Sequence, residues 1–208
     1  MNKIIKEIKE MKKRIVLTFV AAVAAVSLMG CGTTTTTTET TEETGVTSPV
    51  VKATEQYDEV ISQLNSDQWY AFADINKDYD VLLVADGTYD NLDGNMVTID
   101  ATLYGLDDNG KPFELGTVQS SGTAYPLAVY NQCIMYGGNH FMFMTFVDGG
   151  SMITKLYADE IFDTEGNATY SVFDYDEHFE GNVDDDTKLK EMYEMYGQAT
   201  VINFTQAQ

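Results

Sequence analysis

The sequence predicts an α+β domain made mostly of antiparallel β-sheet, and three observations support this fold class. From residue 68 to residue 174, apolar side chains recur at every second position, which is the period of a half-buried strand. Segments rich in Asp, Asn and Gly separate these runs and have the chemistry of hairpin turns. Helical periodicity occurs only before and after this region. We therefore expect a meander, either open and strongly curled or barrel-like, flanked by an N-terminal and a C-terminal helix.

The first predicted element is a helix that starts at Thr54. Four apolar side chains recur at helical spacing and form one stripe: Tyr57, Val60, Ile61 and Leu64. The polar segment 65–67 ends this helix. The stripe is expected to pack on the sheet.

Nine strands are predicted between the two helices. They are Trp69–Ala73, Val81–Ala85, Met96–Leu106, Phe113–Gln119, Tyr125–Tyr130, Cys133–Tyr136, Phe141–Val147, Ile153–Ile161 and Thr169–Asp174. Phe141–Phe146 is apolar on both faces. This pattern favours a central strand covered on one side by a helix, with a partner-binding strand as the alternative.

The second predicted helix lies near the C-terminus. Three aspartates at 184–186 place negative charge at its start, and Gly197 ends it. Its apolar stripe consists of Leu189, Met192, Tyr193 and Tyr196. A last strand is predicted over Ala199–Thr205.

The N-terminal residues have the pattern of a secretion signal. Lys12-Lys13-Arg14 precedes Ile15–Met29, a run of uncharged residues that is shorter than the ~20 needed to cross a bilayer. Leu28–Cys31 resembles the lipobox of bacterial lipoproteins. This resemblance implies that a diacylglycerol is attached to Cys31, which anchors the chain to the cell membrane, facing outside. A buried helix of a cytosolic protein is the alternative, and Met11 is a second candidate start.

These observations divide the chain into a signal peptide (1–30), a Thr/Glu-rich disordered tether (31–52) and one globular domain (53–208). Without the signal, 6 basic side chains stand against 31 acidic ones, a net charge of −25. Such a charge argues against nucleic acid as a partner. Besides Cys31, the mature chain has only Cys133, so we expect no internal disulfide and interpret Cys133 as a core residue.

The densest candidate site is the loop Asp74–Asp80. Asp74, Asn76, Asp78 and Asp80 place oxygen atoms on alternate residues, as calcium loops do, so Ca²⁺ is a candidate cofactor. The loop departs from an EF-hand, which needs Gly where Tyr79 stands and an acid where Ala85 stands. The alternative is an Asp-rich turn that caps itself.

A resemblance to a known repeat supports the calcium hypothesis. Tyr70–Asn76, with Asp78 and the strand after it, is similar to the Asp-rich loop of FG-GAP calcium-binding repeats. It is still more similar to the degenerate single copy in uncharacterised lipoproteins of gut Clostridia-like bacteria, which Gly122–Leu127 and Tyr136–His140 also resemble. Asp80 does not match the repeat. A single copy of the loop cannot build a propeller.

Two functional hypotheses from different classes follow. The first is a non-catalytic binding or interaction module for an unknown small molecule, glycan or protein. Trp69, Tyr125 and His140 are the candidate ligand-binding residues. Trp69 and Tyr125 belong to a larger set of possible stacking side chains: Trp69, Tyr70, Tyr89, Tyr104, Tyr125, Tyr130 and Tyr136. The alternative is a surface glycan or peptide hydrolase that uses His140 and a carboxylate. No nucleophile elbow, zinc motif or phosphate loop supports catalysis. A structural envelope protein is a third possibility.

Overall fold

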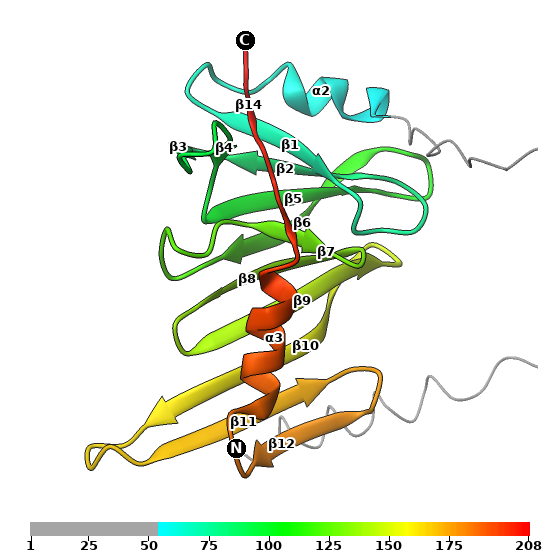
Figure 1. Cartoon of the computed structure of the whole chain (residues 1–208). Coiled ribbons are helices and arrows are strands. Elements are labelled where there is room, and N and C mark those ends of the chain that lie inside the picture. The colour runs from blue at the N-terminus through cyan, green and yellow to red at the C-terminus, as the bar shows by residue number, and fades with distance from the viewer. Residues whose placement is uncertain (1–53) are drawn as a thin grey trace, which may run out of the picture. The chain divides into compact units, whose positions relative to one another are not determined.

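The structure is a computed structural model that describes residues 54–208 (Figure 1). These residues belong to one compact unit. The predicted signal peptide 1–30, the lipidation site Cys31, the alternative start Met11 and the tether 31–52 lie outside the described residues. Within 54–208, no helix has the length and apolar character that spanning a membrane requires.

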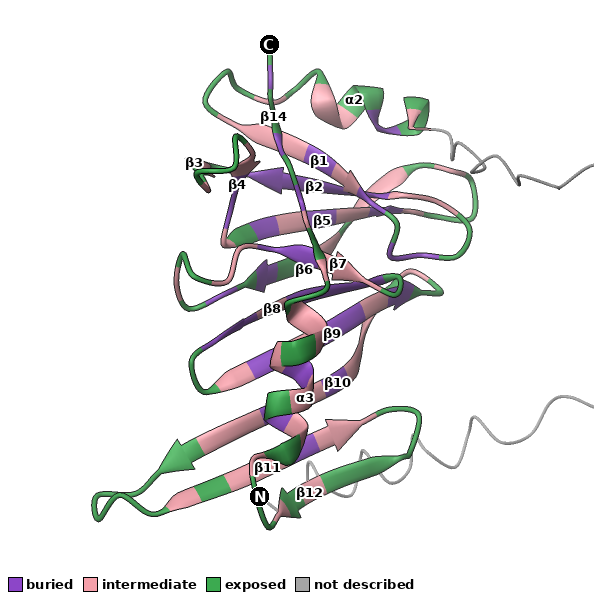
Figure 2. Cartoon of the chain, in the orientation of Figure 1, coloured by how far each residue is buried: buried purple, intermediate pink, exposed green. Residues whose placement is uncertain are grey.

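Four strands from the first half of the described residues and the last strand of the chain form an antiparallel sheet with the order β14-β1-β2-β5-β6. Its strands are β1 (Trp69–Ala73), β2 (Val81–Ala85), β5 (Asp100–Leu106), β6 (Pro112–Gln119) and β14 (Thr205–Gln206). We call it the first sheet. β2 is buried along its whole length because its apolar residues face packing layers on both sides (Figure 2). A separate short hairpin pairs β3 (Tyr89–Asp90) with β4 (Met96–Val97).

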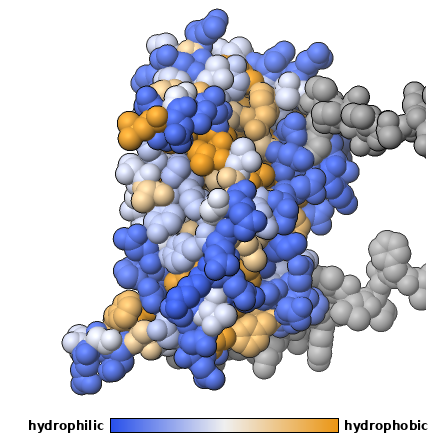
Figure 3. Space-filling view, in the orientation of Figure 1, coloured by the Kyte–Doolittle hydropathy of each residue, from blue (hydrophilic) through white to orange (hydrophobic). Residues whose placement is uncertain are grey.

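The second sheet is also antiparallel, with the order β12-β11-β10-β9-β8-β7-β13. Its strands are β7 (Ala128–Tyr130), β8 (Cys133–Gly138), β9 (Phe141–Asp148), β10 (Ser151–Phe162), β11 (Ala168–Asp174), β12 (Phe179–Val183) and β13 (Thr200–Val201). The helix α3 (Thr187–Tyr196) runs across one face of this sheet (Figure 1). Its outward side is mostly hydrophilic (Figure 3).

Three apolar clusters hold these layers together. The largest joins inward residues of the two sheets, such as Leu83, Leu103 and Ile134. The second joins α3 to the second sheet through a methionine-rich layer that includes Met142 and Met144. The third packs the N-terminal helical segment, η1 (Glu55–Tyr57) and α2 (Asp58–Ile61), on the outer face of the first sheet.

The structure confirms the α+β class and the antiparallel pairing. β1 and β2 have the predicted bounds, and the predicted stripes of both helical segments pack on sheets. β9 is a central strand with α3 on one face, as its apolar character indicated.

Four details of the predicted sheet are wrong. Neither sheet closes into a barrel within residues 54–208. Met96–Leu106 divides into β4 and β5 because the Thr98 hydroxyl bonds the backbone of Asp100, which interrupts the strand. Ala199–Thr205 divides into β13 and β14, which pair with different sheets. β12 was not predicted, because an exposed edge strand lacks an alternating apolar pattern (Figure 2).

Candidate functional site

The Asp74–Asp80 loop is organised by the side chain of Asn76, which is 3% exposed. The Asn76 Oδ1 accepts hydrogen bonds from the backbone N–H groups of Asp78, at 2.8 Å, and Tyr79, at 3.2 Å. The Asn76 Nδ2 donates to the carbonyl oxygen of Val147 at 3.0 Å. The amide therefore shapes the turn and ties it to β9, which is the self-capping arrangement.

One of the four predicted calcium ligands, Asn76, uses its side-chain oxygen within the loop. The Oδ1 atom of Asn76 is occupied by two backbone donors. Within residues 54–208, no three His, Cys, Asp or Glu side chains form a group that could hold a metal ion. Calcium binding by Asp74, Asn76, Asp78 and Asp80 therefore stays a prediction from the sequence.

A row of aromatic side chains crosses the second sheet on the face opposite α3. Cross-strand pairing places Tyr136 beside Phe143, Phe143 beside Tyr157, and Tyr157 beside Phe173. Their chain neighbours Met135, Met142, Met144, Leu156, Ala158 and Val172 pack with α3. Because adjacent strand residues point to opposite faces, the four rings share the other face. We call Tyr136, Phe143, Tyr157 and Phe173 the aromatic ladder.

Three of the four ladder rings are in direct contact. The Tyr136 and Phe143 centroids are 5.0 Å apart, and the Phe143 and Tyr157 centroids are 4.3 Å apart. Phe141 meets the edge of Phe143 with a centroid distance of 6.0 Å. Tyr136 also packs against the core between the sheets, whereas all four ladder residues remain half-buried. The ladder therefore continues the core outward as a partly exposed apolar surface.

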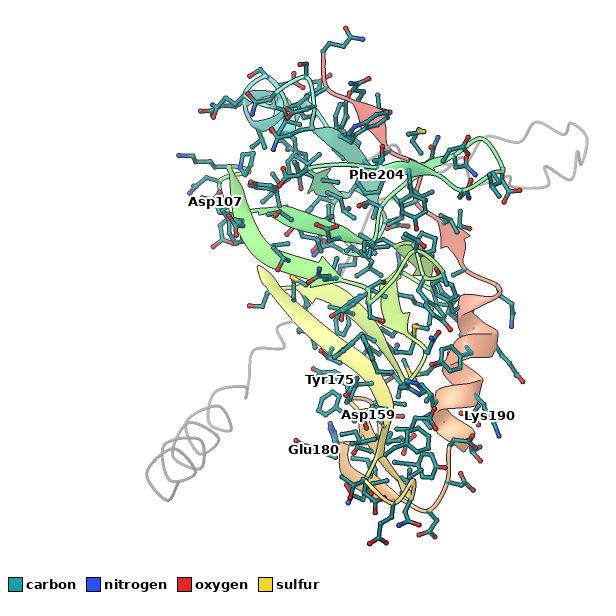
Figure 4. All side chains as sticks on the ribbon, turned by 90° about the vertical axis from the view of Figure 1, so that its left-hand side faces the viewer. Asp107, Asp159, Tyr175, Glu180, Lys190 and Phe204 are labelled. Carbon is teal, nitrogen blue, oxygen red and sulfur yellow. The ribbon has the colours of Figure 1, made fainter. Side chains whose placement is uncertain are left out.

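Carboxylates border the ladder. The Tyr157 hydroxyl donates a 2.6 Å hydrogen bond to the Asp159 Oδ2, while the Asp159 Oδ1 is shielded from solvent without a hydrogen-bond partner. Burial, and then this hydrogen bond, raise the pKa of Tyr157. Glu180 pairs with Phe173 at the end of the row. Asp159 and Glu180 lie on the opposite side of the sheet from Lys190 of α3 (Figure 4). The surface thus combines flat rings with hydrogen-bond acceptors.

His140 lies in the turn between β8 and β9 and pairs with a carboxylate. Its Nδ1 is 2.8 Å from the Glu160 Oε1, and its ring meets the Phe162 ring edge-on with a centroid distance of 5.6 Å. The His140 side chain is 60% exposed and the Glu160 side chain 18% exposed. The structure therefore forms an acid–base pair at the surface.

The other two predicted ligand-binding residues lie in separate settings. Trp69 lies on β1 and packs against the core between the sheets. Tyr125 packs on α3, where its ring centroid is 5.9 Å from that of Tyr193 and 5.7 Å from that of Tyr196. Both side chains are half-buried and make structural contacts.

Sequence reasoning identified one member of the ladder, Tyr136, and missed the arrangement. Phe143, Tyr157 and Phe173 were assigned to strands, but their alignment depends on cross-strand register, which the sequence alone does not specify. The double-sided apolar character of Phe141–Phe146 was the available signal. In the structure, the second face of this strand carries Phe141 and Phe143.

Cys133 is 2% exposed and free, as its interpretation as a core residue predicted. Burial raises the pKa of its thiol, which keeps the thiolate scarce at neutral pH.

No protein-family model, curated protein or solved structure matches this chain.

Proposed function

We propose that this protein is a lipid-anchored, non-catalytic binding module outside the cell membrane. The lipid on Cys31 holds it at the membrane, and the aromatic ladder provides its ligand-binding surface. The single observation that carries the proposal is the row of four half-buried aromatic rings in register across four adjacent strands.

Aromatic faces of this kind stack on flat apolar surfaces such as sugar rings and peptide side chains. The exposed Glu180 carboxylate at the end of the row accepts hydrogen bonds and donates none when ionised. Its position favours ligands that carry hydroxyl or N–H donors beside an apolar face. Glycans and peptides both meet this requirement.

The binding surface is tested by nuclear magnetic resonance on the purified chain, with a panel of linear oligosaccharides and short peptides. We expect at least one probe to shift amide signals of β9, β10 and β11. Tyr157→Leu should weaken the binding of that probe about tenfold, because a stacking aromatic side chain contributes ~1–1.5 kcal/mol to the binding free energy. Tyr170→Leu is the matched control, since Tyr170 lies on β11 and, by strand alternation, on the face toward α3. Signals that stay unchanged with the whole panel would argue against the ladder as a binding surface.

Lipid anchoring is tested separately by metabolic labelling with a palmitate analogue. We expect the wild-type chain to be labelled and the Cys31→Ser variant to remain unlabelled in the soluble fraction. Labelling of the variant at the wild-type level would exclude Cys31 as the acylation site.

A second candidate function is hydrolysis of a surface glycan or peptide by His140 and Glu160. The 2.8 Å contact between the two side chains favours it, because a carboxylate can orient an imidazole that acts as a general base. The test is release of product from a glycan and peptide panel. Activity that disappears in both His140→Gln and Glu160→Gln, with the fold intact, would support this alternative over the binding module.

A further inference from the structure

A cleft of about 290 Å³ lies where the Asp74 loop meets the ends of strands from the second sheet. Its walls come from the β1–β2 loop, the β7–β8 turn, the end of β9, the first half of β10 and the β11–β12 turn. None of the four ladder residues lines it. Its volume is at the low end for small-molecule pockets, which limits an occupant to the size of one or two amino-acid residues.

Two ion pairs border this cleft. The Lys77 Nζ is 3.9 Å from the Asp148 Oδ1, and the Lys155 Nζ is 3.3 Å from the Asp176 Oδ2. Residues 54–208 contain five lysines and no arginine, so two of the five permanent cations of an acidic domain line one small cleft. Exposed ion pairs contribute little to stability, so either partner can exchange its contact for a ligand.

The inner lining is apolar. Ile75, Cys133 and Val147 are each no more than 2% exposed, and Phe146 adds a half-buried ring. An occupant that reached these residues would bury an apolar group, which is favourable in proportion to the area removed from water. The cleft thus places charges of both signs beside an apolar floor.

Hydrogen bonds between the walls hold the cleft in shape. The Val147 N–H donates to the Ile75 carbonyl oxygen at 2.8 Å, and the Asn76 Nδ2 donates to the Val147 carbonyl oxygen at 3.0 Å. The Gln132 Nε2 donates to the Asp74 Oδ1 at 3.4 Å. These bonds join the β1–β2 loop to β9 and to the β7–β8 turn. A site with fixed walls loses less entropy when a ligand binds.

We propose that this cleft binds a small zwitterion with an apolar side chain, of the amino-acid or dipeptide class. The carboxylate of the ligand pairs with Lys77 and Lys155, its ammonium pairs with Asp148 and Asp176, and its side chain contacts the apolar floor around Phe146. A simple anion would face two aspartates and the strongly negative field of the domain. A simple cation would leave both lysines without their aspartate partners.

The experiment is a titration of the purified full chain with L-leucine and L-leucyl-L-leucine, followed by nuclear magnetic resonance. At least one of the two probes should shift the amide signals of Cys133, Val147 and Gln132 in a saturable way. N-acetyl-leucyl-leucine lacks the ammonium and leucyl-leucinamide lacks the carboxylate. For a dipeptide site, each should bind about tenfold more weakly or worse, because one charge-assisted contact is lost.

Two variants test the residues directly. Lys155→Gln and Asp176→Asn should each lower the affinity for the probe about tenfold. Lys188→Gln is the matched control, because Lys188 also forms a partly exposed ion pair, with Glu191 on α3, and does not line the cleft. The Lys188→Gln variant should bind the probe with the affinity of the wild-type chain.

Three results would overturn the proposal. The first is no saturable shift with either zwitterion up to about 10 mM. The second is equal affinity for a zwitterion and for one of its blocked analogues, which would reveal a plain anion or cation site. The third is an affinity for the probe that is the same in Lys155→Gln, in Asp176→Asn and in the wild-type chain. The ladder proposal is unaffected by all three, because none of the four ladder residues lines the cleft.

Discussion

The ring of Tyr136 stacks on the ring of Phe143, with centroids 5.0 Å apart and ring planes within 6° of parallel. The two residues occupy paired positions on β8 and β9. Tyr136 contacts the core between the sheets, whereas Phe143 carries the aromatic row onward to Tyr157. This pair therefore connects the buried core to the proposed binding surface.

The first prediction concerns the energy of that stacking. In a double-mutant cycle with Tyr136→Leu and Phe143→Leu, we expect a coupling free energy of about 1 kcal/mol, as for other aromatic pairs in contact. Urea denaturation of the four proteins measures it. Tyr136→Phe serves as the control, because it removes only the hydroxyl that bonds the Thr145 Oγ1 at 3.3 Å. Strictly additive effects would show that the rings do not stabilise each other.

The second prediction concerns the Asp74 loop. Asn76→Ala should lower the free energy of unfolding by about 2–4 kcal/mol in EDTA, because three hydrogen bonds of a buried amide are lost. Asp78→Ala should lower the free energy of unfolding much less, since the Asp78 carboxylate takes no part in these three hydrogen bonds. Urea denaturation in EDTA measures both changes.

The Asp78→Ala variant also tests the calcium hypothesis. A calcium site filled to 100 times its dissociation constant would add about 2.7 kcal/mol and raise the melting temperature by roughly 3 °C. That rise would have to disappear in Asp78→Ala. A melting temperature that is equal in calcium and in EDTA would leave the loop as a turn only.

The third prediction concerns the close approach at Gly137. A Cβ atom there would lie 2.5 Å from the backbone oxygen of Phe141 and 2.9 Å from the Met142 Sδ. Gly137→Ala should therefore lower the free energy of unfolding by about 1–3 kcal/mol, as overpacking does. Gly87→Ala is the matched control, because nothing lies within 4 Å of its Cβ position. Equal urea midpoints for the two variants would contradict the packing described at the β8–β9 turn.

The fourth prediction concerns pH. Burial, together with the neighbouring Tyr125 and Glu160, raises the pKa of Tyr193 to about 12. The unfolded chain, with a tyrosine pKa near 10, releases this proton first. Stability from this group is thus complete below pH 10 and is lost as the pH rises from about 10 to about 12.

Tyr193→Phe separates this effect from the hydrogen bond that the Tyr193 hydroxyl donates to the Gly138 carbonyl oxygen at 2.7 Å. At about pH 8 the variant should be less stable by ~1 kcal/mol. At about pH 11 the difference in urea midpoint between the two proteins should be smaller. Ionisation of Tyr193 in the unfolded state lowers the stability of the wild-type chain, and the variant has no ionisable group at this position. A gap that is constant or widens would contradict the raised pKa.

The parts of this fold that the sequence predicted are those with strong local patterns. β1 and β2 alternate or are continuously apolar, and Leu189 and Met192 stand at helical spacing, so short-range pattern was sufficient for them. Phe179–Val183 has no such pattern, because an edge strand buries little on either face. Its pairing with β11 becomes visible only in three dimensions.

The candidate sites were predictable to a lesser degree, because each depends on contacts between distant segments. The spacing of Asn76 predicts a possible metal ligand. The spacing could not predict that Asn76 also bonds the carbonyl oxygen of Val147, which is 71 positions away along the chain. The ladder likewise depends on the register of β8 to β11, which includes an irregularity between Thr154 and Leu156. No local pattern specifies that shift.

The two final strands have a consequence for how the domain folds. β13 pairs with β7 in the second sheet, and β14 then pairs with β1, the first strand of the first sheet. Between them, Ile202 and Phe204 enter the core that the sheets share. Hairpins can therefore form one after another along the chain, but neither sheet gains its last edge strand until the final residues are present. Pairing of strands that lie so far apart in the sequence has a large entropic cost. We therefore expect these two strands to pair late and folding to be slow.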